Sequence, residues 1–137
     1  MTVYPLVLLT HVLAAVLGLG LVTATAVAAR PAVAAAPALV LSLVRGAQIS
    51  LGVVFLSGGA LNWVAGGAFA ETWWFRLAAI SLIATGVAVA YARRVATRWR
   101  AGGLEAAPAR TRIARTSWVA VALVAWIVAL MELRPFG

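Results

Sequence analysis

The sequence has no cysteine, no lysine and no aspartate, and it contains one histidine and three glutamates. Without cysteine there is no disulfide, no thiolate ligand and no cysteine nucleophile. A single histidine leaves too few ligands for a closed mononuclear zinc or copper site within one chain. The sequence also lacks the glycine-rich motifs of nucleotide-binding loops. We therefore predict no metal site and no nucleotide site, and the scarcity of catalytic groups favours a protein that is not an enzyme.

Charged residues make up 10% of the chain and hydrophobic residues 65%, with a mean hydropathy of +1.06. Typical soluble domains contain about 25% charged residues and roughly 45–50% apolar residues. The apolar residues also form long runs, and about 20 of them in a helix suffice to cross a bilayer. This composition indicates an integral membrane protein.

We predict a single membrane domain over residues 1–137, an all-α transmembrane four-helix bundle. The predicted spans cover about residues 4–29, 38–64, 74–92 and 117–133. A cleaved signal peptide fits the first span poorly, because no positive segment precedes it and His11 interrupts it. Arg30-Pro31 ends this span, Pro37 begins the next one, and Gly66-Gly67 form a turn. Residues 93–116 are predicted to be a polar loop in which Gly102, Gly103 and Pro108 break any continuous helix.

All eleven basic residues are arginine, and most of them gather on one side of the predicted spans. Seven lie between the third and fourth spans: Arg93, Arg94, Arg98, Arg100, Arg110, Arg112 and Arg115. The positive-inside rule then places this loop in the cytoplasm and both termini outside, in a bacterial inner membrane. The loop is expected to attract anionic lipids, and with only Trp99 available for stacking on bases it does not favour nucleic-acid binding.

His11 lies about seven residues into the first span, or roughly 10 Å below the outer boundary. An ionisable group at this depth requires an explanation. It could ligate haem or a metal or transfer protons, or it could be a packed imidazole that bonds to a neighbouring helix. Arg45 and Gln48 lie in the second span towards the cytoplasm. We expect either that Arg45 snorkels to the headgroups or that the two residues contact a lipid or another anion.

Polar groups also occur at the outer ends of the other spans, namely Asn62, Arg76, Glu132 and Arg134. Together with His11 they could converge on a small polar pocket near the outer surface, with Arg76 and Glu132 as an ion pair. Alternatively, they are ordinary interfacial residues. Small residues such as Ala14 with Gly18 allow helices to approach closely. They could form a homo-oligomer interface or pack the helices within one subunit.

The chain resembles the small bacterial four-span membrane proteins that include CopD-like copper-resistance domains and HemJ-type protoporphyrinogen oxidases. The resemblance rests on short motifs: His11-Val12-Leu13-Ala14-Ala15, Trp74-Phe75-Arg76-Leu77 and Met131-Glu132-Leu133-Arg134-Pro135. In the HemJ-type branch it would make His11 the haem-ligating histidine and Arg76 its basic partner.

Three functions remain open at this point. The first is an oligomeric or accessory membrane subunit, either a homo-oligomer or part of a larger membrane complex, that has a pocket towards the outside. The second is a parallel-oligomer transporter or channel for a small solute or ion, because short chains need partners to build a path. The third is a haem-dependent membrane oxidoreductase that uses His11.

Overall fold

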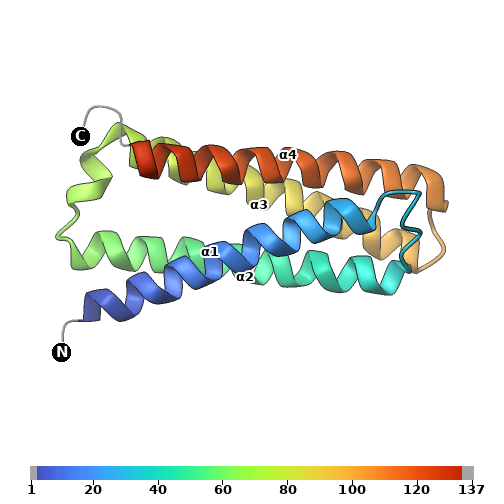
Figure 1. Cartoon of the computed structure of the whole chain (residues 1–137), viewed down its shortest axis with the longest axis horizontal. Coiled ribbons are helices and arrows are strands. Elements are labelled where there is room, and N and C mark those ends of the chain that lie inside the picture. Colours follow the sequence, from blue (N-terminus) through green and yellow to red (C-terminus); the bar gives the residue numbers. More distant parts are fainter. Residues whose placement is uncertain (1–2, 134–137) are drawn as a thin grey trace.

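A computed structural model describes residues 3–133, and in this part of the chain the fold consists of helices without strands. Four long antiparallel helices form a bundle, and a short 3₁₀-helix joins the second to the third (Figure 1). Their bounds are α1 Val3–Ala28, α2 Pro37–Val64, η1 Ala68–Glu71, α3 Trp73–Arg100 and α4 Ala106–Leu133. The predicted all-α four-helix bundle is confirmed.

Each of the four long helices is long and apolar enough to cross a membrane. Helices α2, α3 and α4 have 28 residues each, which corresponds to about 42 Å at 1.5 Å per residue. The hydrocarbon core of a bilayer is only about 30 Å thick. The bundle is therefore longer than the apolar layer it could cross. Which side of a membrane the termini face stays a prediction.

The helix ends lie close to the predicted breaks. Pro37 occupies the first turn of α2, where its missing N–H removes no helical hydrogen bond. After α2 the chain turns through Gly66 and Gly67, whose φ angles of 69° and 83° are ones that glycine adopts without strain. The 3₁₀-helix η1 that follows was not predicted.

The predicted 93–116 loop is wrong over most of its length. Helix α3 continues to Arg100 and α4 begins at Ala106, so that only residues 101–105 connect them. Gly102, with a φ of 77°, provides the break. Hydropathy marks only the apolar part of a helix, whereas arginine and alanine are good helix formers in any solvent. The arginine-rich segment is thus two helical extensions joined by a short turn.

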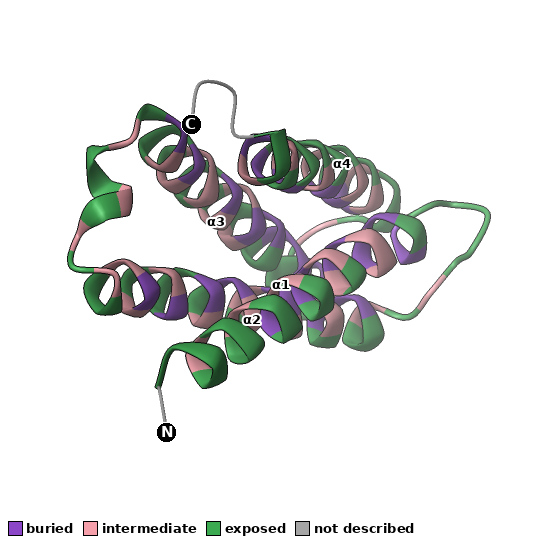
Figure 2. Cartoon of the chain, turned by 60° about the vertical axis from the view of Figure 1, so that its left-hand side comes forward, coloured by how far each residue is buried: buried purple, intermediate pink, exposed green. Residues whose placement is uncertain are grey.

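The helices pack as two hairpins, α1 with α2 and α3 with α4, and the hairpins contact each other less extensively. Helix α1 runs obliquely across α2, with its first residues away from the other hairpin (Figure 1). Buried residues form inward stripes on each helix (Figure 2). The main core lies towards the arginine-rich end and includes Leu41, Val44 and Ile113, each at most 2% exposed. A small separate cluster, Ala78, Ile127 and Leu130, lies towards the other end.

Small residues bring α1 and α2 together within one chain. A Cβ atom added to Gly18 would lie 3.4 Å from the Cβ of Ser50, and one added to Gly46 would lie 3.1 Å from Cδ1 of Leu21. Gly58 makes the same kind of approach to the His11 ring, at 3.4 Å from its Cε1. These glycines therefore allow helices to pack closely within one subunit. This is one of the two roles given above for the small residues, the other being a homo-oligomer interface.

Candidate functional site

The half of the bundle away from the arginine-rich end encloses a cavity of about 290 Å³. All four helices line it, for example through Ala15 of α1, Phe55 of α2, Phe75 of α3 and Ile127 of α4. The lining is almost entirely apolar, and its polar side chains are His11 and Asn62. Small-molecule sites of about 300–1,000 Å³ with an apolar lining and a few polar groups are the usual pattern in proteins. We call this space the outer cavity.

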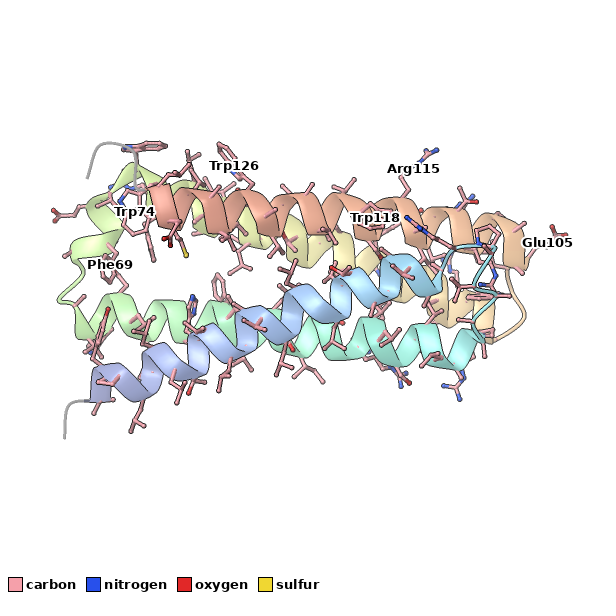
Figure 3. The ribbon with its side chains drawn as sticks, in the orientation of Figure 1. Phe69, Trp74, Glu105, Arg115, Trp118 and Trp126 are labelled. Atoms are coloured by element: carbon pink, nitrogen blue, oxygen red, sulfur yellow. The ribbon has the colours of Figure 1, made fainter. Side chains whose placement is uncertain are left out.

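A second space of about 130 Å³ adjoins the outer cavity and shares His11, Gly58, Phe75 and Met131 with it. Its remaining walls are largely aromatic and include Phe69 of η1 and Trp74 of α3. These two rings lie at the end of the bundle where η1 connects α2 to α3 (Figure 3), with their centroids 6.1 Å apart. His11 therefore stands where the deep apolar space meets the aromatic one.

A hydrogen bond across the α1–α2 interface fixes the His11 ring. Its Nδ1 lies 2.9 Å from Oγ of Ser57, and this hydroxyl donates to the Val53 carbonyl at 2.6 Å. Because the serine proton is engaged with the carbonyl, the serine oxygen accepts from Nδ1–H. The neutral imidazole then carries its lone pair on Nε2. His11 can thus offer a bound molecule a hydrogen-bond acceptor, or a metal a ligand.

Asn62 is the second polar side chain of the lining, one helical turn beyond Gly58 on α2. Its Oδ1 accepts a hydrogen bond of 3.0 Å from the backbone N–H of Ala70, which ties η1 to the end of α2. The amide oxygen is thereby engaged, and the two N–H groups are what Asn62 has left to donate. His11 and Asn62 thus both line the outer cavity, which is mainly apolar rather than polar.

Arg76 and Glu132 are not among the residues that line the outer cavity. Nε of Arg76 donates to the Ala70 carbonyl at 2.8 Å, so this arginine fastens η1 from the α3 side. Glu132 is exposed at the end of α4. Its pairing with Arg76 stays a prediction, and Arg134 lies outside the described residues. The two residues predicted to contact a lipid or anion are at the opposite end, where Oε1 of Gln48 accepts a 2.9 Å hydrogen bond from Nη1 of Arg93 and Arg45 is exposed.

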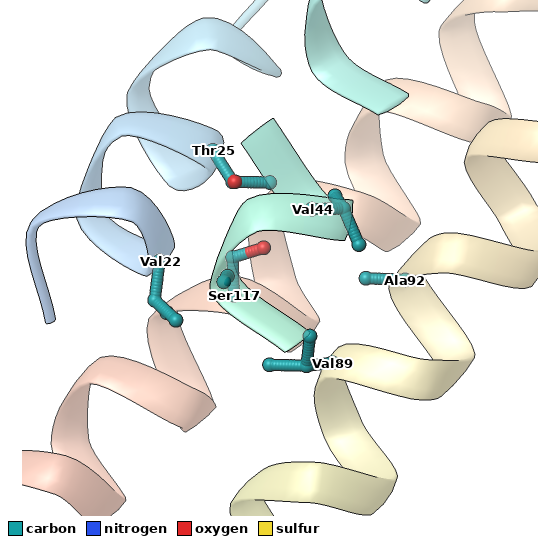
Figure 4. Close-up of a pocket in the computed structure, with 7 residues that line it drawn as sticks. Val22, Thr25, Val44, Val89, Ala92 and Ser117 are labelled. Carbon is teal, nitrogen blue, oxygen red and sulfur yellow. The ribbon is translucent and has the colours of Figure 1, made fainter. Parts of the chain in front are cut away.

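A cavity in the arginine-rich half is much smaller than the outer cavity. It measures about 10 Å³, room for about one water molecule, and lies between side chains that the four helices direct at one another (Figure 4). Two guanidinium–indole contacts reinforce this end: Arg110 lies 4.7 Å from the Trp99 ring centroid, and Arg30 lies 5.4 Å from that of Trp118. Nη2 of Arg110 also donates to the Ala35 carbonyl at 2.7 Å. These contacts close the bundle around the α1–α2 loop.

Among residues 3–133, no three histidine, cysteine or acidic side chains gather where they could hold a metal ion. The candidate site is therefore the apolar outer cavity, with the His11 imidazole held in its wall by Ser57. No family model, curated protein or solved structure matches the chain.

Sequence reasoning identified His11 but missed two residues that define its surroundings. Neither Ser57 nor the side chain of Met131 is assigned a role by the sequence analysis, in which Met131 occurs only within a terminal motif. The depth of Ser57 below the outer end of α2 resembles that of His11 below the start of α1. This similarity in depth is the sequence signal from which a contact between His11 and Ser57 could have been predicted.

Proposed function

We propose that this protein spans the bacterial inner membrane four times, with the arginine-rich end in the cytoplasm and the ends carrying Val3 and Leu133 outside. The four helices are long and apolar enough for this arrangement. Trp63, Trp73 and Trp74 occur together where α2 ends and α3 begins, as tryptophans do at membrane interfaces. Seven arginines on the helical extensions at the other end favour a cytoplasmic location.

Within the membrane the protein acts as a small-molecule-binding subunit, an accessory component that is either a homo-oligomer or part of a larger complex. The single observation that carries this proposal is the outer cavity, about 290 Å³ in volume and lined by all four helices with His11 on its wall. The walls select a mostly apolar molecule. The Nε2 lone pair of His11 selects one polar group that donates a hydrogen bond, such as a hydroxyl.

A transporter or channel is less well supported by this geometry. A path for a solute would have to continue through the arginine-rich half, past the main hydrophobic core and a cavity of only about 10 Å³. Conducting a solute through one chain would require opening the main hydrophobic core.

Native mass spectrometry of the full chain, purified from its host membrane in mild detergent, tests the binding proposal. We expect a co-purified molecule of defined mass on the wild type. Ala79→Leu, which places a larger side chain in the cavity wall, should remove it, and His11→Phe should weaken it. Ala84→Leu is the matched control, because Ala84 lies on the same helix but is exposed. The proposal is wrong if no such molecule is present, or if both leucine variants retain it equally.

A second candidate, haem-dependent redox chemistry, is favoured by the donor set of the cavity. Metal-ligating histidines usually donate their other ring N–H to a fixed partner, as Nδ1 of His11 does to Ser57. Met131 lines the same cavity, and histidine with methionine is an axial pair known for haem. These residues would hold the iron, and haem would supply one-electron chemistry. Haem is larger than a drug-sized ligand, however. The His11 and Met131 donors therefore suit haem better than the volume of the outer cavity, about 290 Å³, does.

An absorption spectrum of the same preparation separates the two candidates. Bound haem gives a Soret band, which His11→Ala should abolish and Met131→Leu should shift. A colourless protein prepared with ample haem supply would rule out this candidate and leave the apolar-ligand proposal standing.

A further inference from the structure

A hydrogen bond joins two polar side chains across the surface between α2 and α3, and a third polar side chain lies one helical turn away on α2. Arg93 of α3 donates from Nη1 to Oε1 of Gln48 on α2, at 2.9 Å. Arg45 precedes Gln48 by three residues in α2, so both project from one face of that helix. Arg45 and Arg93 are exposed, and Gln48 is half-buried. We call these three residues the inner arginine cluster.

The cluster lies at a defined height along the helices. Arg93 follows Trp73 by 20 residues of α3, which corresponds to about 30 Å. Arg45 precedes Trp63 by 18 residues of α2, or about 27 Å. If these tryptophans mark one edge of the hydrocarbon, which is about 30 Å thick, the cluster lies at the opposite edge. This is the level at which lipid phosphates begin.

No acidic side chain of the protein can neutralise this cluster. The chain has three glutamates, Glu71, Glu105 and Glu132. Glu71 and Glu132 are at the far end of the bundle, and Glu105 lies in the turn beyond the end of α3. Guanidinium groups at the edge of a bilayer are attracted to anionic lipid headgroups.

The groups of the cluster that are left to bind a ligand are N–H donors. Oε1 of Gln48 is engaged by Arg93, which leaves the amide N–H groups. The Arg45 guanidinium and the remaining N–H groups of Arg93 have no acceptor capacity. Planar guanidinium groups match phosphate oxygens in a bidentate manner. Gln48 holds Arg93 beside α2 and is thus a positioning residue.

We propose that Arg45, Gln48 and Arg93 form a binding site for a phosphate monoanion, the headgroup phosphate of an anionic phospholipid in the leaflet at the arginine-rich end. The site rests on the proposed membrane placement and is independent of the outer cavity. It differs from a diffuse attraction of lipid to all arginines because a hydrogen bond joins Gln48 of α2 to Arg93 of α3 and so positions one of the two guanidinium groups.

The test uses the full chain in mild detergent with added phosphatidylglycerol or phosphatidylcholine, and measures bound lipid by native mass spectrometry. We expect wild-type protein to retain phosphatidylglycerol preferentially. The double variant Arg45→Gln/Arg93→Gln should lose about tenfold or more of this retention, since each arginine near the surface contributes substantially to binding anionic lipid. The matched control Arg98→Gln/Arg100→Gln removes the same charge from exposed positions nearer the end of α3 and should stay within about twofold of wild type.

Gln48→Glu gives a second and sharper variant. The carboxylate would pair with Arg93 inside the cluster and repel the phosphate, so retention should fall although the shape is preserved. Circular dichroism checks that all variants keep their helicity. Equal loss of phosphatidylglycerol in both double variants, or unchanged retention in Gln48→Glu, would overturn the site in favour of diffuse attraction.

A competition with inorganic phosphate at millimolar concentration identifies the source of the anion. If it displaces phosphatidylglycerol, the site accepts phosphate from water as well as from lipid. If phosphatidylglycerol stays bound, the acyl chains contribute and the ligand is a lipid. Both results support a phosphate site, and a wild type that retains neither lipid preferentially contradicts it. Neither result depends on whether the outer cavity binds a ligand.

Discussion

The two ends of the bundle differ in how they fill the space between the same four helices. The cavity in the arginine-rich half measures about 10 Å³, whereas the outer cavity measures about 290 Å³. At the closed end Leu41, Trp99 and Ile113 fill the interior. At the hollow end the facing positions include the small residues Ala15, Gly58 and Ala79. Large side chains therefore fill the interior at the arginine-rich end, whereas small side chains leave a cavity at the other end.

The difference follows from the solvent around each end in the proposed orientation. Helices of about 42 Å extend roughly 12 Å beyond the hydrocarbon on the arginine-rich side. Water surrounds this part, so burial of apolar side chains drives it to close. In lipid there is no such driving force between helices. A cavity can therefore persist in the membrane-embedded half as long as the closed half holds the helices together.

The largest effect should come from truncating the closed core. Ile113→Ala removes a fully buried side chain and should lower the free energy of unfolding by about 2–5 kcal/mol. Ile127→Ala makes the same change in the wall of the outer cavity, where the side chain already faces space, and should cost roughly 1–2 kcal/mol. Unfolding by sodium dodecyl sulfate in mixed micelles measures both. Equal losses would mean that the two ends are packed alike.

A smaller effect is expected from the contacts that close the arginine-rich end. Arg110→Met removes the stacking on Trp99 and the hydrogen bond to Ala35, and should cost about 1–2 kcal/mol. The loss is limited because Nη1 of Arg110 is buried without a partner. Arg112→Met, at an exposed neighbouring position, should change stability by less than about 0.5 kcal/mol. The same detergent unfolding assay applies, and indistinguishable variants would show that the Arg110 contacts do not close the end.

The smallest changes in stability are expected when two glycines of α2 are replaced by alanine, and the two replacements should differ in direction. A Cβ at Gly46 would lie 3.1 Å from Cδ1 of Leu21, whereas one at Gly59, beside the outer cavity, would meet no atom within 4 Å. Gly46→Ala should therefore be neutral to destabilising by up to about 1 kcal/mol. Gly59→Ala should stabilise by about 0.5–1 kcal/mol, because alanine favours the helix. Thermal unfolding temperatures compare the two, and a stabilising Gly46→Ala would mean that α1 and α2 approach less closely than described.

The sequence predicts the helices well because apolar runs, prolines and glycines act locally. It failed at residues 93–116, where hydropathy reports the polarity of the arginines but not their helical conformation. The spacing of Ala92, Ala96 and Trp99, at intervals of three or four residues, is the helical pattern that should have been recognised.

The site was only partly predictable. An intramembrane histidine is conspicuous in a sequence, and His11 is indeed on the cavity wall. The cavity itself results from the angle at which α1 crosses its neighbours and from small side chains that face one another. Neither property can be read from one helix at a time. Contacts between distant residues, such as His11 with Ser57 and Gln48 with Arg93, could not be assigned for the same reason.

The two hydrogen bonds that Asn62 and Arg76 make to the backbone of Ala70 bear on how a guest could enter. They hold the α2–α3 connection from both sides and restrain its movement. Helix α1 has no buried residue before Ala14 and is the element least restrained at that end. We therefore expect the proposed guest to exchange sideways, past α1, with the surrounding lipid. Because His11 is on the same helix, a movement of α1 would both open this route and withdraw the polar anchor.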